Sequence, residues 1–442
     1  MIRLILLLLL AVITSISIQL QTVSAQNVLT LEEAVQQGLE NNYNIQISRN
    51  LLEQASNNRS LGNAGFFPVV GASASRVETM EDSDQEFADG SVQENRDARN
   101  TSTNAAVELN WTLFDGLRMF AGYNRLGVLE EISDEELRLS MENLITDIAL
   151  QYFEIVRISE QVINLESNLE VSQERIEIEE AKVEIGSGSE YDLLQARSDL
   201  NEDRSARFRE LNRLSEAKIS LNELLARDPH TEYDVSRNIS LNRFLSQEEL
   251  YQKLMAENAE LSLARLQKDI TRYEIRELRG ERYPEISFNS SYYYDRAEND
   301  GGFFRFNEAR GLRVGLTARI NIFDGFNTNR RVQNAHINRK NAELAYESDK
   351  LRLESQFLAT FRTYQNSLEL LDLEEENFVN AEETLDIALE RFRLGSISSL
   401  EFREAQRTLL AAEDRLVSAR FEAKVAETAL LNLSGELELL FQ

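Results

Sequence analysis

Apolar residues recur at helical spacing over two long stretches of the chain. In the first, 117–185, they stand three or four positions apart, as in Leu137, Met141, Leu144, Ile145, Ile148, Tyr152 and Ile155. Such spacing lines one face of an α-helix. The second stretch follows Gly325 and runs to Gly395, and neither stretch contains a proline. At ~1.5 Å per residue, each predicts a helix on the order of 100 Å long.

Glycine and serine end both long helices, in the segments 186–189 and 395–398. Helical spacing then resumes, and it predicts returning helices over 190–227 and 399–433. A further helix is predicted at the front of each half of the chain. It begins at Thr30 or Ser246, each followed three residues later by Glu, the pattern of a capping box. Pro68 and Pro284 are expected to end these helices.

Alternation of apolar and polar residues predicts strands before each long helix. Val107, Leu109 and Trp111 alternate with polar residues, and Leu312, Val314 and Leu316 do so in the second half. A period of two indicates a half-buried strand. With their less regular partners, the expected strands cover 69–78, 105–114, 285–295 and 312–323. All four are about as long as the ~9–11 residues that a tilted strand needs to cross a bilayer. The polar segment between the first two strands is expected to be a long external loop.

The two halves of the chain are copies of one unit. Pro68 and Pro284 stand 216 positions apart, whereas Gly116 and Gly325, each ending a Phe-Asp-Gly triplet, stand 209 apart. Landmarks in the same order at two consistent offsets indicate an internal repeat. The predicted organisation is a first repeat over 26–227, a linker over 228–245, a second repeat over 246–435 and a tail over 436–442. The tail ends in a sequence, 439–442, that resembles a protease-site tail, so its origin stays open.

The N-terminal segment has the pattern of a secretory signal peptide. Arg3 precedes an apolar run that breaks at Thr14, and small residues end the segment at Ala25. A membrane anchor, the alternative, needs ~20 apolar residues. The expected result is a cleaved signal over 1–25 and export of the mature chain.

Composition excludes several classes of protein. The formal net charge is −29, so a nucleic-acid partner, which needs a clustered basic surface, is not expected. The chain has no cysteine and two histidines, His230 and His336, far apart in the sequence. No motif for nucleophilic, metal or phosphate chemistry stands out, so a hydrolase is a weak alternative. We expect no enzyme activity, no metal and no cofactor.

The strand count points to an assembly of several chains. Four strands cannot close into a barrel, since small barrels need about eight. Unpaired strand edges are not tolerated in lipid, because each unsatisfied amide costs several kcal/mol. Three chains in a ring supply twelve strands and twelve long helical segments. The predicted fold is therefore mainly α with a membrane β-barrel part, as a homotrimeric 12-stranded β-barrel stacked on a 12-helix α-barrel.

The whole mature chain resembles the TolC-type outer-membrane efflux protein family. The resemblance rests on the two tandem copies and on two landmarks: Arg393-Leu-Gly-Ser396 with the following Leu400-Glu-Phe-Arg-Glu-Ala405, and Gly186 with the following Tyr191-Asp-Leu-Leu-Gln-Ala196. It implies a trimeric outer-membrane duct that receives substrates from an inner-membrane pump through a periplasmic adaptor, in drug efflux or type I secretion. Many relatives carry lipid on an N-terminal Cys, which this chain lacks. A secreted coiled-coil scaffold or adaptor without a pore is the alternative.

The resemblance also assigns the candidate site residues. The Gly-Ser turns are expected to dock the adaptor, or else to be ordinary helix connections: Gly186, Ser187, Gly188, Ser189, Arg393, Leu394, Gly395 and Ser396. An acidic periplasmic mouth is expected at Asp192, Glu401 and Glu404, with a solvated helix start as the alternative. Family gate positions hold Phe392 and Ile397 here, which puts that gating network in doubt. Strand-to-helix junctions, where Asp caps a helix and Gly allows unusual dihedrals, are expected at Phe114, Asp115, Gly116, Phe323, Asp324 and Gly325.

Overall fold

The computed structural model describes residues 28–237, 239–301 and 304–441. The predicted signal segment, 1–25, lies outside these ranges. The chain divides into two compact units. The first contains the chain up to Ser48, Leu137–Glu260 and the chain from Lys350, and the second contains Arg49–Glu136 and Leu261–Asp349. Each repeat therefore contributes to both units.

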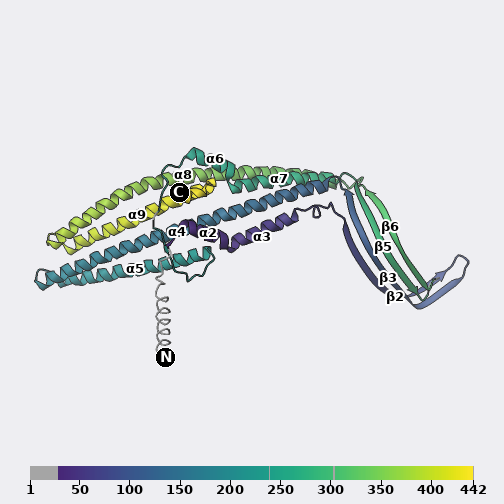
Figure 1. Cartoon of the computed structure of the whole chain (residues 1–442), viewed down its shortest axis with the longest axis horizontal. Coiled ribbons are helices and arrows are strands. Elements are labelled where there is room, and N and C mark those ends of the chain that lie inside the picture. Colours follow the sequence, from purple (N-terminus) through teal and green to yellow (C-terminus); the bar gives the residue numbers. More distant parts are fainter. Residues whose placement is uncertain (1–27, 238, 302–303, 442) are drawn as a thin grey trace, which may run out of the picture. The chain divides into compact units, whose positions relative to one another are not determined.

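Four long helices form two helical hairpins (Figure 1). Helices α4 (Arg118–Glu184) and α8 (Asn327–Arg393) have 67 residues each, and α5 (Glu190–Leu224) and α9 (Ser399–Ser434) fold back along them. Ion pairs such as Arg207–Glu166 join α5 to α4, and Arg415–Glu374 joins α9 to α8. The observed helices agree closely with the predicted ones, because helical spacing without proline leaves the chain few alternatives.

The front helix of each repeat is broken, and the prediction of one continuous helix is wrong. The first repeat has α2 (Leu31–Asn41) and α3 (Tyr43–Asn58), and the second has α6 (Gln247–Glu257) and α7 (Ala259–Gly280). One asparagine, Asn42 or Asn258, separates each pair in an extended conformation. The predicted starts hold, since Thr30 and Ser246 are the N-caps. The helices end before Pro68 and Pro284, so the prolines do not stop them.

The two asparagines make the same contact in both repeats. Asn42 Nδ2 donates to the carbonyl of Leu224 at 2.9 Å, and Asn258 Nδ2 donates to the carbonyl of Leu433 at 3.1 Å. Asn42 Oδ1 also accepts the backbone N–H of Asn44, at the start of α3. Carbonyls at the end of a helix have no intrahelical partner. Each asparagine therefore joins the end of a returning helix to a break between two short helices, and this contact repeats with the duplication.

The strands form one antiparallel sheet within the second unit. Its strands are β2 (Val69–Glu86), β3 (Val92–Phe114), β5 (Glu285–Asn299) and β6 (Phe306–Arg319), in the order β2-β3-β5-β6. The two repeats meet where β3 pairs with β5. Within the described part of the chain, the outer edges of β2 and β6 have no strand partner.

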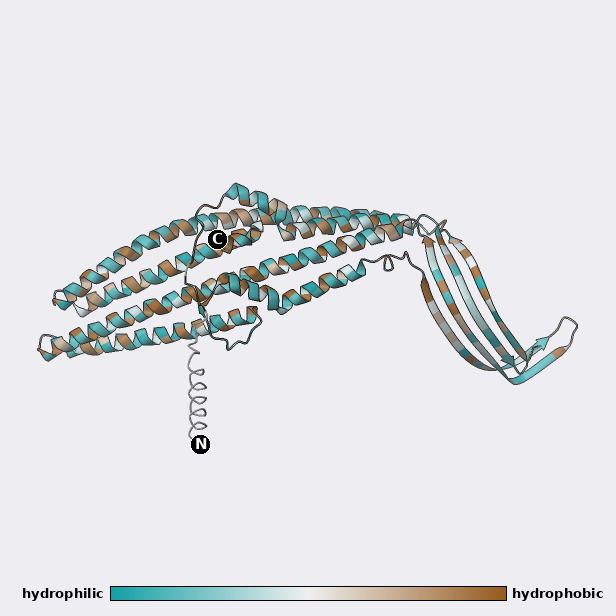
Figure 2. Ribbon diagram, viewed as in Figure 1, coloured by the Kyte–Doolittle hydropathy of each residue, from teal (hydrophilic) through white to brown (hydrophobic). Residues whose placement is uncertain are grey.

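The strand register separates an apolar face from a polar face, and Figure 2 shows hydrophobic and hydrophilic residues alternating along the strands. Val107 pairs with both Ala72 and Tyr292, and Tyr292 pairs with Leu312, so one row of apolar residues crosses all four strands. By alternation, this face carries Val70, Ala72, Val107, Leu109, Trp111, Phe288, Tyr292, Leu312, Val314 and Leu316. The opposite face carries mainly small polar residues and glycine: Gly71, Ser73, Asn110, Asn289, Ser291, Gly315 and Thr317.

Several strand boundaries differ from the prediction, and β5 ends at Asn299 and β6 begins at Phe306 where 295 and 312 were expected. Strands β2 and β3 continue through most of the segment expected to be a loop, and only 87–91 connect them. Their outer parts lack apolar alternation, so no periodic pattern marks them, although their backbones pair, with one register shift between Glu81 and Ser83. Strand β6 ends at Arg319, short of the predicted limit at 323.

Short elements complete the first unit. Strand β1 (Val28–Leu29) pairs in parallel with β4 (Asp234–Val235) of the linker. The tail forms a short 3-10 helix, η1 (Leu437–Phe441), with Leu437 and Leu440 buried. No helix in the described ranges is both long enough and apolar enough to cross a membrane.

Candidate functional site

The two Gly-Ser turns have the same backbone structure. Gly186 has φ +77° and Gly395 has φ +71°, in the left-handed region that favours glycine. In the first turn, Ser187 donates its backbone N–H to the carbonyl of Lys182 at 2.9 Å, and in the second, Ser396 donates to Arg391 at 2.8 Å. A Cβ added at either glycine would meet nothing within 4 Å. Both tips therefore present an open, tightly turned backbone to solvent.

Serines at the ends of the turns start the returning helices. Ser189 Oγ accepts the N–H of Tyr191 at 3.2 Å, and Ser398 Oγ accepts that of Glu401 at 3.2 Å. Gly188 has a different role, since a Cβ there would lie 2.7 Å from that of Lys182. Each returning helix therefore begins at a capping serine, although the other side chains of the two turns differ.

Large apolar side chains surround the turns and are exposed. Ile185 and Tyr191 flank the first turn at 78% and 72% exposure, and Leu394 and Leu400 flank the second at 81% and 77%. Of these, sequence analysis assigned only Leu394 to the site. The other three could have been identified from the sequence by their position within five residues of a turn glycine. At the tip of a helical hairpin there is no core to bury an apolar side chain.

The three expected mouth acids are placed differently. Asp192 lies in the first turn of α5, and Glu401 and Glu404 are exposed on α9. The Glu401 carboxylate accepts from the backbone N–H and the hydroxyl of Ser398, each at 2.8 Å, and completes a capping box. These bonds lower the pKa of Glu401 below its ordinary value, so it is ionised at neutral pH. Glu401 therefore has the helix-start role that the sequence left open beside the mouth role.

The positions of the family gate form an apolar joint between α8 and α9. Phe392 is fully buried and stacks on Phe402, with ring centroids 4.8 Å apart. The ammonium of Lys182 lies 3.5 Å from the centroid of the Phe392 ring. Ile397 packs against the same cluster. Next to this joint, Arg393 pairs with Glu174 of α4 and with Glu390 of its own helix.

A buried ionic network lies close to this joint, and it was not predicted from the sequence. Arg175 of α4 donates to Asp199 of α5 at 2.7 Å and to the hydroxyl of Ser399 of α9 at 2.9 Å. Arg403 of α9 binds both oxygens of Asp203 of α5, each at 2.9 Å. All five side chains are buried. The network thus connects three helices from both hairpins.

Amide and hydroxyl groups extend the network. Gln406 accepts from Arg403 at 3.0 Å and donates to the side chains of Asn168 and Ser172. Ser172 in turn donates to Asp203 at 2.6 Å. Buried polar groups are costly unless they are hydrogen-bonded, and here nearly every group finds a partner.

The charges of the network keep Asp199 ionised. Burial by itself raises the pKa of this carboxyl, but hydrogen bonds from Arg175 and Gln195 and the charge of Arg403 together lower the pKa below its ordinary value. The signal for this network was charged residues at core positions of α5 and α9. In a chain with so many charged residues, the buried ones cannot be told from the exposed ones until the packing of the helices is known.

The Phe-Asp-Gly triplets connect strands to long helices. Asp115 Oδ2 accepts the N–H of Met119 at 2.9 Å, and Asp324 Oδ2 accepts that of Thr328 at 2.7 Å, so each aspartate caps the helix that follows. Gly116 has φ +76°, and a Cβ there would lie 2.2 Å from the carbonyl oxygen of Gly280. No residue with a side chain fits that position. Phe114 is the last residue of β3, whereas Phe323 lies beyond β6.

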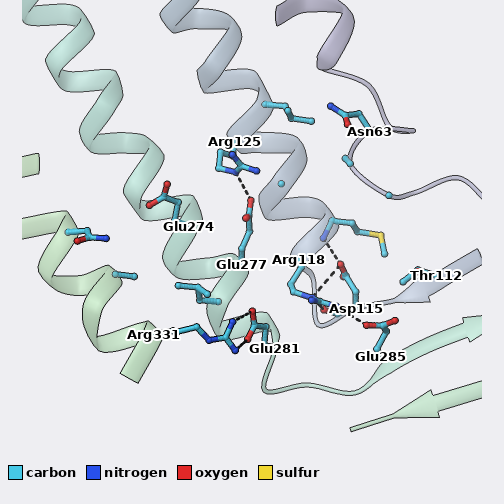
Figure 3. Close-up of a pocket in the computed structure, with 18 of the residues that line it drawn as sticks. Asn63, Thr112, Asp115, Arg118, Arg125, Glu274, Glu277, Glu281, Glu285 and Arg331 are labelled. Carbon is cyan, nitrogen blue, oxygen red and sulfur yellow. Dashed lines mark hydrogen bonds and ion pairs between the residues drawn. The ribbon is translucent and has the colours of Figure 1, made fainter. Parts of the chain in front are cut away.

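A cavity of about 840 Å³ lies beside the first triplet in the second unit (Figure 3). Its arginines all pair with carboxylates: Arg125 with Glu277 at 2.8 Å, Arg118 with Glu285 at 2.9 Å, and Arg331 with Glu281. In the described residues, no group of His, Cys, Asp or Glu is arranged to hold a metal ion. The arginines that line the cavity are therefore all neutralised by ion pairs.

Comparison with known proteins gives a consistent result across the chain. The model of a family described as outer membrane efflux protein matches residues 34–227 and 250–436, which are the two repeats. The chain is 22% identical to the outer membrane protein TolC of Vibrio cholerae, over 69% of this chain and 70% of that one. It is 23% identical to the alkaline protease secretion protein AprF of Pseudomonas aeruginosa, over 90% of this chain and 83% of that one.

Solved structures share the fold. The outer membrane channel CmeC of Campylobacter jejuni matches with a TM-score of 0.77 at 16% identity, over 92% of this chain and 86% of that one. A membrane protein of Pseudomonas aeruginosa matches with a TM-score of 0.76 at 17% identity, over 91% and 90%. The path of the chain is thus that of known channels.

Proposed function

Because this chain belongs to the outer membrane efflux protein family, we propose that it is the exit duct of a tripartite efflux or type I secretion system. In this role it conducts substrates passively from a periplasmic adaptor and an inner-membrane pump to the exterior. The observation that carries the proposal is the sheet with one apolar and one polar face. Relatives named for efflux and for protease secretion both fit a passive duct.

The apolar face of the sheet supports a place in the outer membrane. Leu312, Val314 and Leu316 are 68%, 58% and 70% exposed in the single chain. A soluble protein rarely exposes an apolar face that crosses four strands. In a membrane, this face contacts lipid, and the polar face lines the water-filled interior.

The open edges of the sheet support a homotrimer. In lipid, the unpaired edges of β2 and β6 would leave backbone groups without partners, which costs several kcal/mol each. Pairing β6 of one copy with β2 of the next removes both edges. Three copies give twelve strands, enough to enclose a channel.

A leucine-rich stripe on α8 supports the same arrangement for the helices. Ile337, Leu344, Leu351 and Leu358 recur at every seventh position and are all exposed in the single chain. A seven-residue apolar repeat is the pattern of a helix that packs on another helix. The helix wall of the proposed trimer supplies that neighbour from the next copy.

A pore-free scaffold, the alternative, has no need of a lipid-facing sheet. The two proposals separate in cell fractionation: the duct is recovered in the outer membrane and migrates differently on gels when heated, whereas a scaffold is recovered in the soluble periplasm. Recovery of the native protein in the soluble fraction would favour the scaffold.

We expect Gly395→Trp to abolish efflux without preventing assembly. The tip has open space around a Cβ at this position, so the indole projects outward and holds a partner away from the turn. The left-handed backbone adds strain of roughly 1–2 kcal/mol, too little to unfold the hairpin. The measurement is drug or export sensitivity of cells together with the amount of trimer in the membrane.

Gly186→Trp is expected to act similarly but less strongly, because its turn lacks the Arg-Leu-Gly-Ser form. Gly395→Ala is the matched control, since it places a Cβ on the same left-handed backbone without the bulk of the indole. Normal efflux in the double Gly186→Trp, Gly395→Trp variant would leave both turns as plain helix connections.

We expect the channel to select cations and to be blocked by polyvalent cations from the periplasmic side. In a ring of three copies, Glu401 and Glu404 give a negative potential at the narrow mouth. Replacing both with Ala should weaken the block and the selectivity, measured in planar bilayers. Because Glu401 also caps α9, Glu404→Ala alone is the cleaner variant. Unchanged block and selectivity in both variants would place these carboxylates away from the lumen.

A further inference from the structure

The second strand-to-helix junction combines exposed apolar side chains with arginines. Ile322, Phe323 and Phe326 are 92%, 71% and 67% exposed. They line a cavity of about 310 Å³ together with Arg282. Arg330 follows one turn later, on the exposed surface of α8. The cavity thus lies between apolar side chains and Arg282, and the carboxylates of Glu281 and Asp324 also line it.

The two arginines have amide partners in place of carboxylates. Arg282 donates to the side chain of Asn329 at 2.8 Å, and Arg330 donates to that of Asn327 at 3.4 Å. Within the described chain, neither forms an ion pair. Nearby acids are already engaged: Glu281 pairs with Arg331, and Asp324 caps α8. Two guanidinium groups therefore keep an unneutralised charge.

The surrounding sequence is unusually basic for this chain. From Gly325 to Ala342 there are four Lys or Arg residues and no Asp or Glu, although the whole chain has a net charge of −29. A local excess of positive charge attracts an anionic surface within about a Debye length, ~8 Å at physiological salt.

The internal repeat provides a comparison within the same molecule. By the offsets of the duplication, Arg282 corresponds to Phe66, and Arg330 corresponds to Ala121. In the first repeat, Phe66 packs edge-on against Phe120 at 4.9 Å. The first junction is thus apolar where the second is basic, so the fold does not require arginine there.

The second junction follows the apolar face of the sheet directly. Strand β6 ends at Arg319, only a few residues before the exposed Ile322. In the proposed duct, which this inference rests on, the junction lies at the level of the lipid headgroups. Aromatic side chains are favoured at that level.

We propose that Arg282 and Arg330 bind the phosphate of an anionic phospholipid in the periplasmic leaflet of the outer membrane. Guanidinium groups bind phosphate oxygens through paired N–H donors. Ile322, Phe323 and Phe326 contact the start of the acyl chains, and the cavity receives part of the headgroup. At the corresponding positions, Phe66 and Ala121, the first junction has no arginine.

The test compares the full-chain complex in nanodiscs of phosphatidylcholine alone and of phosphatidylcholine with phosphatidylglycerol. Native mass spectrometry counts the phosphatidylglycerol that stays bound, and heating measures the stability of the trimer in each lipid. At ~1 kcal/mol for each of the two arginines near the surface, we expect phosphatidylglycerol to be retained roughly thirty-fold over phosphatidylcholine. In Arg282→Gln, Arg330→Gln, this preference should disappear.

Arg339→Gln, Lys340→Gln is the matched control, because it removes the same amount of charge from α8, ~14–15 Å beyond Arg330. It should keep the preference, and inorganic phosphate should not compete. An unchanged preference in Arg282→Gln, Arg330→Gln, or an equal loss in the control, would overturn the proposed site. Loss of trimers in both lipids would also overturn it, by placing the arginines between copies. Failure of the unaltered chain to enter nanodiscs as a channel would instead contradict the proposed duct.

Discussion

Arg403→Met is expected to loosen the helix tips severely. The substitution leaves Asp203 charged, buried and without its bidentate partner, and breaking a buried ion pair in this way costs about 3–5 kcal/mol. Because the lost contact joins α9 to α5, amide exchange in both helices near the network should become about 10²–10⁴ times faster. Hydrogen exchange of the purified complex measures this directly.

A double variant separates the ion pair from a general packing defect. Arg403→Met with Asp203→Leu removes both charges and should recover most of the lost protection, because an apolar pair of similar volume replaces a buried salt bridge at little cost. Arg197→Met is the matched control, since its pair with Glu180 is about half exposed and contributes less than about 1 kcal/mol. Unchanged exchange in Arg403→Met would mean that the network does not hold the hairpins together.

Leu316→Arg is expected to prevent stable insertion of the duct. Leu316 lies on the apolar face of β6, and an arginine facing lipid near the bilayer centre costs about 2–4 kcal/mol in each copy. In a trimer the cost is incurred three times. The amount of heat-modifiable trimer in the outer membrane, compared with total protein, measures the effect.

Thr317→Arg is the matched control on the next residue. Thr317 is exposed in the single chain as Leu316 is, but it lies on the polar face, where Arg313 and Arg319 already stand. This variant should assemble normally and change conductance only. Equal tolerance of both variants would contradict the assignment of the two faces.

The long helices and the repeat were predictable because their signals are local. A helical period sustained over 67 residues, with no proline, leaves little room for another structure. Because the unit is duplicated, each helix and strand can be predicted from two independent stretches of sequence. Strand alternation likewise identified the lipid-length segments, including the apolar faces of β3 and β6.

The features that were not predicted share a physical cause, since each depends on a contact that no local sequence pattern marks. Asn42 breaks a helix because its side chain binds the carbonyl of Leu224, far along the chain. The outer parts of β2 and β3 pair through their backbones without an apolar pattern. Arg403 and Asp203 are two charges among 123 Lys, Arg, Asp and Glu residues, and only packing shows that they face inward.

The central claim is that three copies close one barrel through β2 and β6. The natural chain has no cysteine, so introduced cysteines report on this contact without background. Ser73→Cys on the polar face of β2 is combined in turn with cysteine at Gly311, Arg313, Gly315 or Thr317 of β6. Oxidation in the membrane should produce, for at least one pair, covalent dimers and trimers and nothing larger. Chains that stay monomeric in every pair, or a ladder that stops at two or continues to four, would contradict the account.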